Sequence, residues 1–216
     1  MQKTSFITVL LIILCHSASA QFNSLPFEWN VHVGASHFSA PSFNRALENQ
    51  DLSGISPVGI NVALGIGYRL GKVLVGGNVS RMYGGRDGKF GATTPTVFIA
   101  TNMLHINHWV VVPSLGIGAQ YASALLDKDN IAGSFEDYLT RESNQTSFRH
   151  TTPVVDLGIT FKTYDLFTAT YRTKFKMGYQ TGLSRQPWKV GSTELVNAPR
   201  DRTGAVYLQV SMGIGR

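Results

Sequence analysis

His37 and Ser39 lie two residues apart in the stretch ASHFSAPSFN, and their types and spacing suit nucleophilic chemistry. In an extended chain, residues two apart point to the same side. A histidine beside a serine can act as the base that activates the hydroxyl, with a carboxylate to orient the imidazole. Glu48, Asp51 and Glu136 lie in segments that can reach the pair. The sequence therefore offers His37 and Ser39 as a candidate catalytic pair.

A second group of residues that could take part in chemistry is charged, and its members fall on the polar side of alternating segments. In RTKFK, for example, the three basic residues alternate with Thr and Phe, which is a strand pattern. Because charges in a confined interior must be paired or hydrated, we expect an ion-pair network. A narrow pore that favours anions is the alternative, since the cations of the group outnumber its carboxylates. The group consists of Glu28, Arg69, Asp156, Lys162, Arg172, Lys174 and Lys176, with His32 nearby.

Strict alternation of apolar with small or polar residues recurs along the chain and positions both groups. In VGINVALGIGYRL, residues 58–70, apolar side chains occupy every second position, which indicates a strand with two different surroundings. We recognise eight such segments, an even number. They are residues 26–38, 58–70, 73–83, 94–104, 109–122, 153–162, 166–179 and 203–215.

The connections between these segments alternate between short and long. Tight turns are expected at 71–72, 105–108 and 163–165, and longer polar or Gly/Pro-containing loops at 39–57, 84–93, 123–152 and 180–202. This order is typical of a meander across a membrane, in which periplasmic turns are short and external loops are longer. The loop 123–152 carries charges of both signs without calcium-binding spacing, and we expect it to be solvated, with a short helix near 133–141.

The polar face of the segments is rich in glycine, alanine, serine and asparagine. Such a face would make a poor solvated exterior, which needs Lys and Glu to stay soluble. Small residues suit the interior of an eight-stranded barrel, which leaves room only for side chains. The apolar face then contacts lipid, where every backbone group must be paired and the first strand must close on the last. The predicted fold is all-β, an eight-stranded antiparallel up-and-down transmembrane β-barrel.

Aromatic residues are expected at both ends of the apolar face, where amphipathic rings favour the membrane interfaces. Two groups lie toward opposite ends of the strands. The interface aromatics are Trp29, Tyr68, Trp109 and Phe167 at the periplasmic end, and Tyr121 and Tyr179 at the external end.

The N-terminal residues MQKTSFITVLLIILCHSASA have a positive start, a short apolar core and a small-residue cleavage site, which predict a signal peptide. Residues 1–20 are assigned to this leader, cleaved after Ala20, and residues 21–216 to an outer-membrane barrel domain with periplasmic termini. The only cysteine, Cys15, belongs to the leader, so disulfides and cysteine-ligated metals are excluded from the mature chain. The dispersed net charge of +6 gives no nucleic-acid footprint. No cofactor or metal is expected.

With these features the chain resembles the small eight-stranded outer-membrane proteins of Gram-negative bacteria, such as the OmpX-like proteins and the transmembrane domain of OmpA. The resemblance implies a porin-like barrel in the cell envelope, surrounded by outer-membrane lipid. Such barrels commonly end in an aromatic residue, whereas this chain ends in Met-Gly-Ile-Gly-Arg216. His37 and Ser39 also resemble the His-x-Ser of the lipid A deacylases, which are themselves barrels, although Ala40 stands where that motif has Asn.

Three functions remain open on the sequence alone. The first is a non-enzymatic outer-membrane barrel with a structural or interaction role, which binds envelope proteins or external ligands through its long loops. The second is a barrel enzyme that deacylates lipid A or another membrane lipid through His37 and Ser39. The third is the narrow anion-favouring pore.

Overall fold

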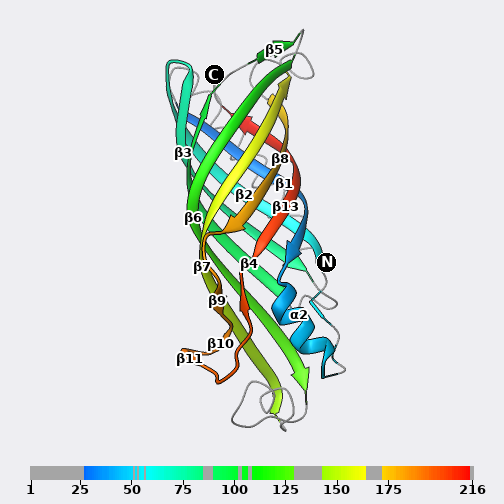
Figure 1. Ribbon diagram of the computed structural model, residues 1–216. Coiled ribbons are helices and arrows are strands. Elements are labelled where there is room, and N and C mark those ends of the chain that lie inside the picture. The colour runs from blue at the N-terminus through cyan, green and yellow to red at the C-terminus, as the bar shows by residue number, and fades with distance from the viewer. Residues whose placement is uncertain are drawn as a thin grey trace, which may run out of the picture.

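The computed structural model describes residues 27–50, 52, 54–55, 57–84, 90–101, 104–106, 109–128, 143–163 and 172–214. Eight long strands form a closed antiparallel up-and-down barrel, which confirms the predicted fold (Figure 1). The expected leader, residues 1–20, and the helix expected near 133–141 lie outside the described residues. In the part of the chain that is described, no helix has the length and apolar character needed to cross a membrane.

The barrel strands follow one another around the wall in sequence order, and β1 pairs with β13 to close it. The pairing runs from Trp29 opposite Ile214 to Ser39 opposite Gly204, without interruption. The strands are β1 (Phe27–Ser39), β2 (Val58–Leu70), β3 (Val73–Gly84), β4 (Phe90–Thr101), β6 (Trp109–Lys128), β7 (Ser143–Thr163), β8 (Arg172–Gly182) and β13 (Gly204–Ile214).

The alternation places the bulky apolar residues outside the barrel and the small or polar residues inside. On β2, Leu64 is 62% exposed and Ile60 is equally so, whereas Asn61 and Ala63 between them are buried. The same in–out order holds along β1 and β13. A period of two therefore places apolar side chains on the outside of the wall and small or polar side chains on the inside.

Three of the long strands differ from the sequence prediction at the end of the barrel opposite the first residues of β1 and the last residues of β13. β4 starts at Phe90 rather than 94, and β6 and β7 extend to Lys128 and from Ser143, so the loops predicted at 84–93 and 123–152 are partly strand. The interior here is apolar, with Phe90 and Ala92 buried inside the wall. Several of the residues that alternate with these inward apolar side chains are polar, among them Thr93 on β4 and Arg149 on β7, so the order of apolar and polar faces seen in the rest of the wall is not kept and the pattern does not extend the predicted strands.

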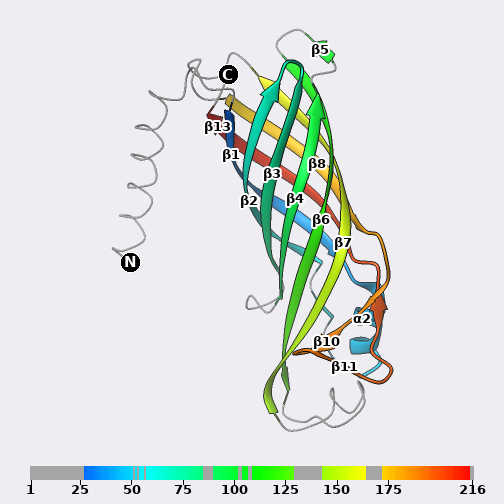
Figure 2. The same cartoon turned by 90° about the vertical axis from the view of Figure 1, so that its left-hand side faces the viewer.

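The predicted loops 39–57 and 180–202 also contain regular structure. The first holds α2 (Pro41–Glu48), and the second holds β9 (Gln186–Pro187), β10 (Lys189–Val190), β11 (Thr193–Glu194) and β12 (Arg200–Asp201). β12 pairs with β9, and β10 pairs with both β7 and β11. Figures 1 and 2 show α2 beside these short strands at one end of the barrel. We call α2 together with residues 183–203 the cap.

The other end of the barrel carries the short connections, and the first barrel strand begins there and the last one ends there. Gly71, which has a positive φ of 61°, and Lys72 form the turn between β2 and β3. The short strand β5 (Leu104–Ile106) pairs with the start of β6. The first residues of β1 and the last residues of β13 lie at this same end. The alternation of long and short connections therefore gives the barrel two chemically different ends.

Candidate functional site: the barrel lumen and its cap

Glu28 is the centre of a charged group inside the barrel, close to the end with the short turns. Its carboxylate lies 3.0 Å from Nη2 of Arg69 and 3.6 Å from Nζ of Lys162, and it contacts the ammonium group of Lys174. Asn30 donates a hydrogen bond to the same carboxylate and accepts one from Lys174. One buried carboxylate thus serves three cations from three other strands.

A second charged group lies around Asp156 on β7. The hydroxyl of Tyr207 donates to Oδ1 of Asp156 at 2.8 Å, and Nζ of Lys176 is 3.9 Å from Oδ2. The same ammonium group lies 5.2 Å from the centre of the Tyr207 ring. The ring crosses Gly178, where a Cβ would lie only 2.3 Å from the Tyr207 oxygen. Glycine in this wall therefore makes room for a large interior side chain.

The structure brings most of the predicted lumen residues into these two groups. Arg69, Lys162 and Lys174 surround Glu28, whereas Lys176 and Tyr207 adjoin Asp156. Arg172 lies on β8 opposite Gly213 of β13, and its side chain is outside the described part of the structure. A further polar pair, Gln209 with Asn61, links β13 and β2 across the lumen, and Thr203 of the cap donates a hydrogen bond to Gln120 of β6.

Apolar side chains fill the lumen beside the Glu28 group. Leu74, Ala100, Val110 and Val112 form a buried cluster, and Phe98 packs against it. A cavity of about 50 Å³ remains between this cluster and the polar groups. The lumen is thus packed with side chains at several levels.

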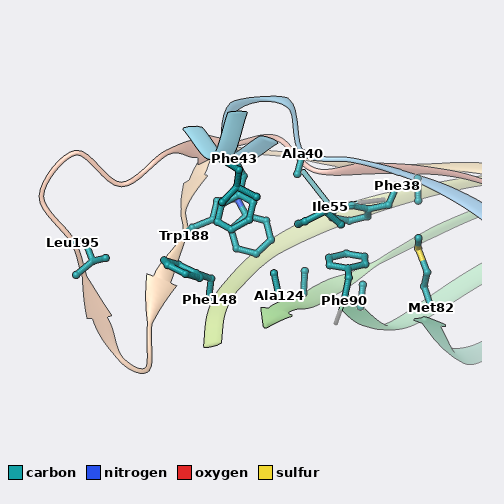
Figure 3. Packing of buried hydrophobic residues seen from close by; sticks show 14 residues of the cluster. Phe38, Ala40, Phe43, Ile55, Met82, Phe90, Ala124, Phe148, Trp188 and Leu195 are labelled. Atoms are coloured by element: carbon teal, nitrogen blue, oxygen red, sulfur yellow. The ribbon is translucent and has the colours of Figure 1, made fainter. Parts of the chain in front are cut away.

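A larger apolar cluster joins the cap to the barrel (Figure 3). Phe43 of α2 stacks on Trp188 at 4.1 Å between ring centres, and its ring meets that of Phe148 edge-on at 5.5 Å. Leu47, one helical turn after Phe43, is fully buried in the same cluster. Aromatic burial of this kind stabilises a contact strongly, so α2 is fixed over the barrel end.

Asp201 holds α2 from the other half of the cap. Its Oδ1 accepts a hydrogen bond from the backbone N–H of Ser42 at 2.7 Å, and its Oδ2 accepts from the N–H of Phe43 and from the Trp188 indole, both at 2.9 Å. The residue at the N-cap position, Ala40, has no side chain that can accept these bonds. Asp201 therefore caps the helix from 159 residues away in sequence.

His150, on β7, lies directly beside Asp201. Its Nε2 is 3.3 Å from the backbone oxygen of Asp201, and its ring lies 5.0 Å from the indole of Trp188. Burial lowers the pKa of His150 below its usual 6.5, although the hydrogen bond to the Asp201 carbonyl opposes the shift. Burial thus favours the neutral imidazole over the charged one.

The candidate catalytic pair lies on the outward face of β1, near the cap. His37 and Ser39 are both exposed, and no side-chain hydrogen bond within the described residues joins them. Glu48 is exposed on α2, whereas Asp51 and Glu136 are outside the described residues. The pair remains a prediction without an observed orienting carboxylate.

The predicted interface aromatics lie on the outside of the barrel at two levels. Trp29, Tyr68 and Trp109 are exposed at the end with the short turns, and Tyr121 and Tyr179 at the cap end. Phe167 is outside the described residues. Trp109 and Tyr121 are twelve residues apart on β6. At about 3.4 Å per residue and a strand tilt of about 40°, this separation corresponds to a height of about 30 Å.

The sequence analysis missed the residues that join the cap to the barrel: Trp188 and Asp201 of the cap, and Phe148 and His150 of β7. A weak signal for α2 was present, since Pro41 suits a first helical position and Phe43 and Leu47 have helical spacing. No local signal links Asp201 to that helix. Among the described residues, no group of three or more His, Cys, Asp or Glu is placed to hold a metal ion.

No protein-family model matches this sequence, and no curated protein is detectably similar to it. Solved structures with the same fold do exist. Neisserial surface protein A superposes with a TM-score of 0.58 at 10% identity, covering 88% of this chain and 96% of its own. A major outer membrane protein from Thermus thermophilus superposes at 0.52 with 8% identity, covering 87% of this chain and 99% of its own. At such identities the likeness shows the fold.

Proposed function

We propose that this protein is an integral outer-membrane barrel whose lumen is closed and whose cap forms an external surface for interaction. The observation that carries the proposal is the outward face, which presents a continuous set of bulky apolar side chains while charged groups lie inside. The fold shared with Neisserial surface protein A and the Thermus outer membrane protein supports it. The packed lumen favours this role over a pore.

The membrane part of the proposal is tested with the same substitution at two depths of β2. Leu64 is mid-strand and Leu70 is at the strand end, and both point outward. Leu64→Arg should destabilise the protein in lipid vesicles by about 2–4 kcal/mol, whereas Leu70→Arg should cost about 0–1 kcal/mol. Denaturant unfolding in vesicles measures both values. Equal small losses, in a protein that stays soluble without detergent, would overturn the proposal.

The orientation is tested by labelling introduced cysteines with a membrane-impermeant maleimide on intact cells. Ser192→Cys places a thiol on the exposed turn of the cap, and Lys72→Cys places one on the opposite turn. The proposal expects rapid labelling of the first and labelling of the second only after the outer membrane is opened. The reverse pattern would place the cap in the periplasm and remove its interaction role.

A further inference from the structure

The cavity in the lumen lies where five strands contribute polar side chains to one space. Its lining includes His32, Asn78, Lys174 and Lys176, together with Ser114 and Thr160. Gly65 lines the same space, and a Cβ there would meet Oδ1 of Asn78 and Nε2 of His32 at 3.4 and 3.7 Å. The absence of a side chain at Gly65 thus contributes to the cavity.

Two buried polar atoms of the cavity lining have no hydrogen-bond partner within the described structure. They are Nδ1 of His32 and Oδ1 of Asn78, and each residue is only 8% exposed. Buried polar groups in folded proteins are almost always paired with protein, ordered water or a bound group. Two such atoms on residues that line one cavity therefore favour a bound ion or ordered water there.

The charges around the cavity indicate the sign of that occupant. The described cations of the lumen are Arg69, Lys162, Lys174 and Lys176, and the described carboxylates are those of Glu28 and Asp156. Glu28 already serves three cations. Lys176 faces Asp156 only at 3.9 Å, while Tyr207 occupies the other oxygen of that carboxylate. Among the described residues that line the cavity, the three lysines at 162, 174 and 176 thus outnumber the one carboxylate, that of Glu28.

We propose that the cavity holds one monovalent anion the size of chloride, between the ammonium groups of Lys174 and Lys176 and the imidazole of His32. A cavity of about 50 Å³ accommodates roughly three or four water-sized particles, which suffices for a halide with its remaining waters. His32 donates when its proton is on Nδ1, and Asn78 donates when its amide is turned by half a rotation. The anion is a structural counterion, and its presence does not depend on the role proposed for the cap.

Bromide identifies the occupant directly. Crystals of the mature protein grown with bromide in place of chloride should show an anomalous peak inside the cavity. Gly65→Ala adds a methyl group at ordinary contact distance and should remove or weaken the peak. Gly77→Ala is the matched control, because a Cβ there has only the Thr96 carbonyl oxygen, at 3.8 Å, within 4 Å. Water alone in the wild-type cavity, or bromide only on external residues as an adventitious ion, would overturn the proposal.

Stability supplies a second readout in solution. Replacing gluconate by chloride at constant ionic strength should raise the unfolding midpoint of the refolded protein. The rise should saturate with chloride concentration, as expected for a site that exists only in the folded protein. Lys176→Gln should raise the half-saturating chloride concentration at least tenfold, whereas Lys189→Gln, on β10 of the cap, should leave it unchanged. A response that never saturates, or that is the same in both variants and in Gly65→Ala, would contradict the site.

Discussion

Glu28 and Asp201 are both buried carboxylates, yet the two regions that they organise use opposite kinds of partner. Glu28, in the lumen, faces three cationic side chains. Asp201, in the cap, accepts hydrogen bonds from two backbone N–H groups and an indole, none of which carries a formal charge. The positive end of the α2 dipole supplies part of what the cations supply to Glu28. A buried carboxylate can therefore be stabilised by charge or by directed dipoles.

The difference predicts which part of the protein loses stability when either carboxylate is removed. Without Glu28, uncompensated cations remain inside the barrel wall, and the barrel itself is destabilised. Without Asp201, neutral donors are left without partners at the barrel end, and the eight-stranded wall keeps its own hydrogen bonds. The lumen group thus belongs to the barrel, whereas the Asp201 group belongs to the cap.

The largest effect is expected for Glu28→Gln, which keeps the shape of the side chain and removes its charge. Breaking a buried ion pair from one side costs about 3–5 kcal/mol, because the partner charge stays buried. The unfolding midpoint of the whole barrel in denaturant should fall accordingly. A midpoint within error of wild type would show that solvent or another group neutralises the three cations.

A smaller and more local effect is expected for Asp201→Ala. The N–H of Phe43 and the indole of Trp188 lose their acceptor, and buried donors without partners cost about 1–3 kcal/mol each. Trypsin should then cleave after Arg45 in α2 much faster, while the barrel still migrates as a folded band on an unheated gel. Asp201→Asn retains one acceptor oxygen and should be cleaved at an intermediate rate. Equal rates in all three proteins would remove Asp201 from its capping role.

A pH effect is expected at the cap, through His150. Its pKa is lowered in the folded protein, so the unfolded chain binds more protons between that value and 6.5. Cap stability is therefore complete above pH 6.5 and decreases as the pH falls, by at most about 1.4 kcal/mol per pH unit. Trypsin cleavage after Arg45 should accelerate below pH 6.5 in the wild type, with the pH response of trypsin itself measured on an unfolded substrate. His150→Phe should abolish that acceleration; an unchanged profile would exclude the histidine as its cause.

The smallest effect is expected for Glu194→Gln, which repeats the Glu28 substitution in an exposed pair. Oε1 of Glu194 lies 2.8 Å from Nη2 of Arg200, but both side chains are largely in solvent. Exposed ion pairs contribute about 0–1 kcal/mol, and salt screens them. The rate of cleavage after Arg45 should hardly change. A large effect would mean that this pair, and not only Asp201, fixes the cap.

The sequence could predict the barrel because its period of two is present wherever the two faces differ. For the same reason it assigns Glu28, Lys174 and Lys176 to one face of their strands. It could not predict the cap. Phe90 and Ala92 are apolar residues that point inward, opposite to the apolar residues of the rest of the wall, so the strand ends near the cap were missed as well. The contact between Asp201 and α2 depends on closure of the barrel rather than on neighbouring residues.

The contact between Asp201 and α2 also depends on the register in which β1 and β13 pair at the seam, where the barrel closes. The last pair of that seam is Ser39 with Gly204, and the capping contact joins Ser42 to Asp201, three residues beyond each partner. A slip of one residue would turn every side chain to the wrong face, but a slip of two would not. That second error would move Asp201 by about 7 Å along the strand, away from the start of α2. The helix therefore distinguishes the correct seam from a misalignment that the alternating sequence tolerates.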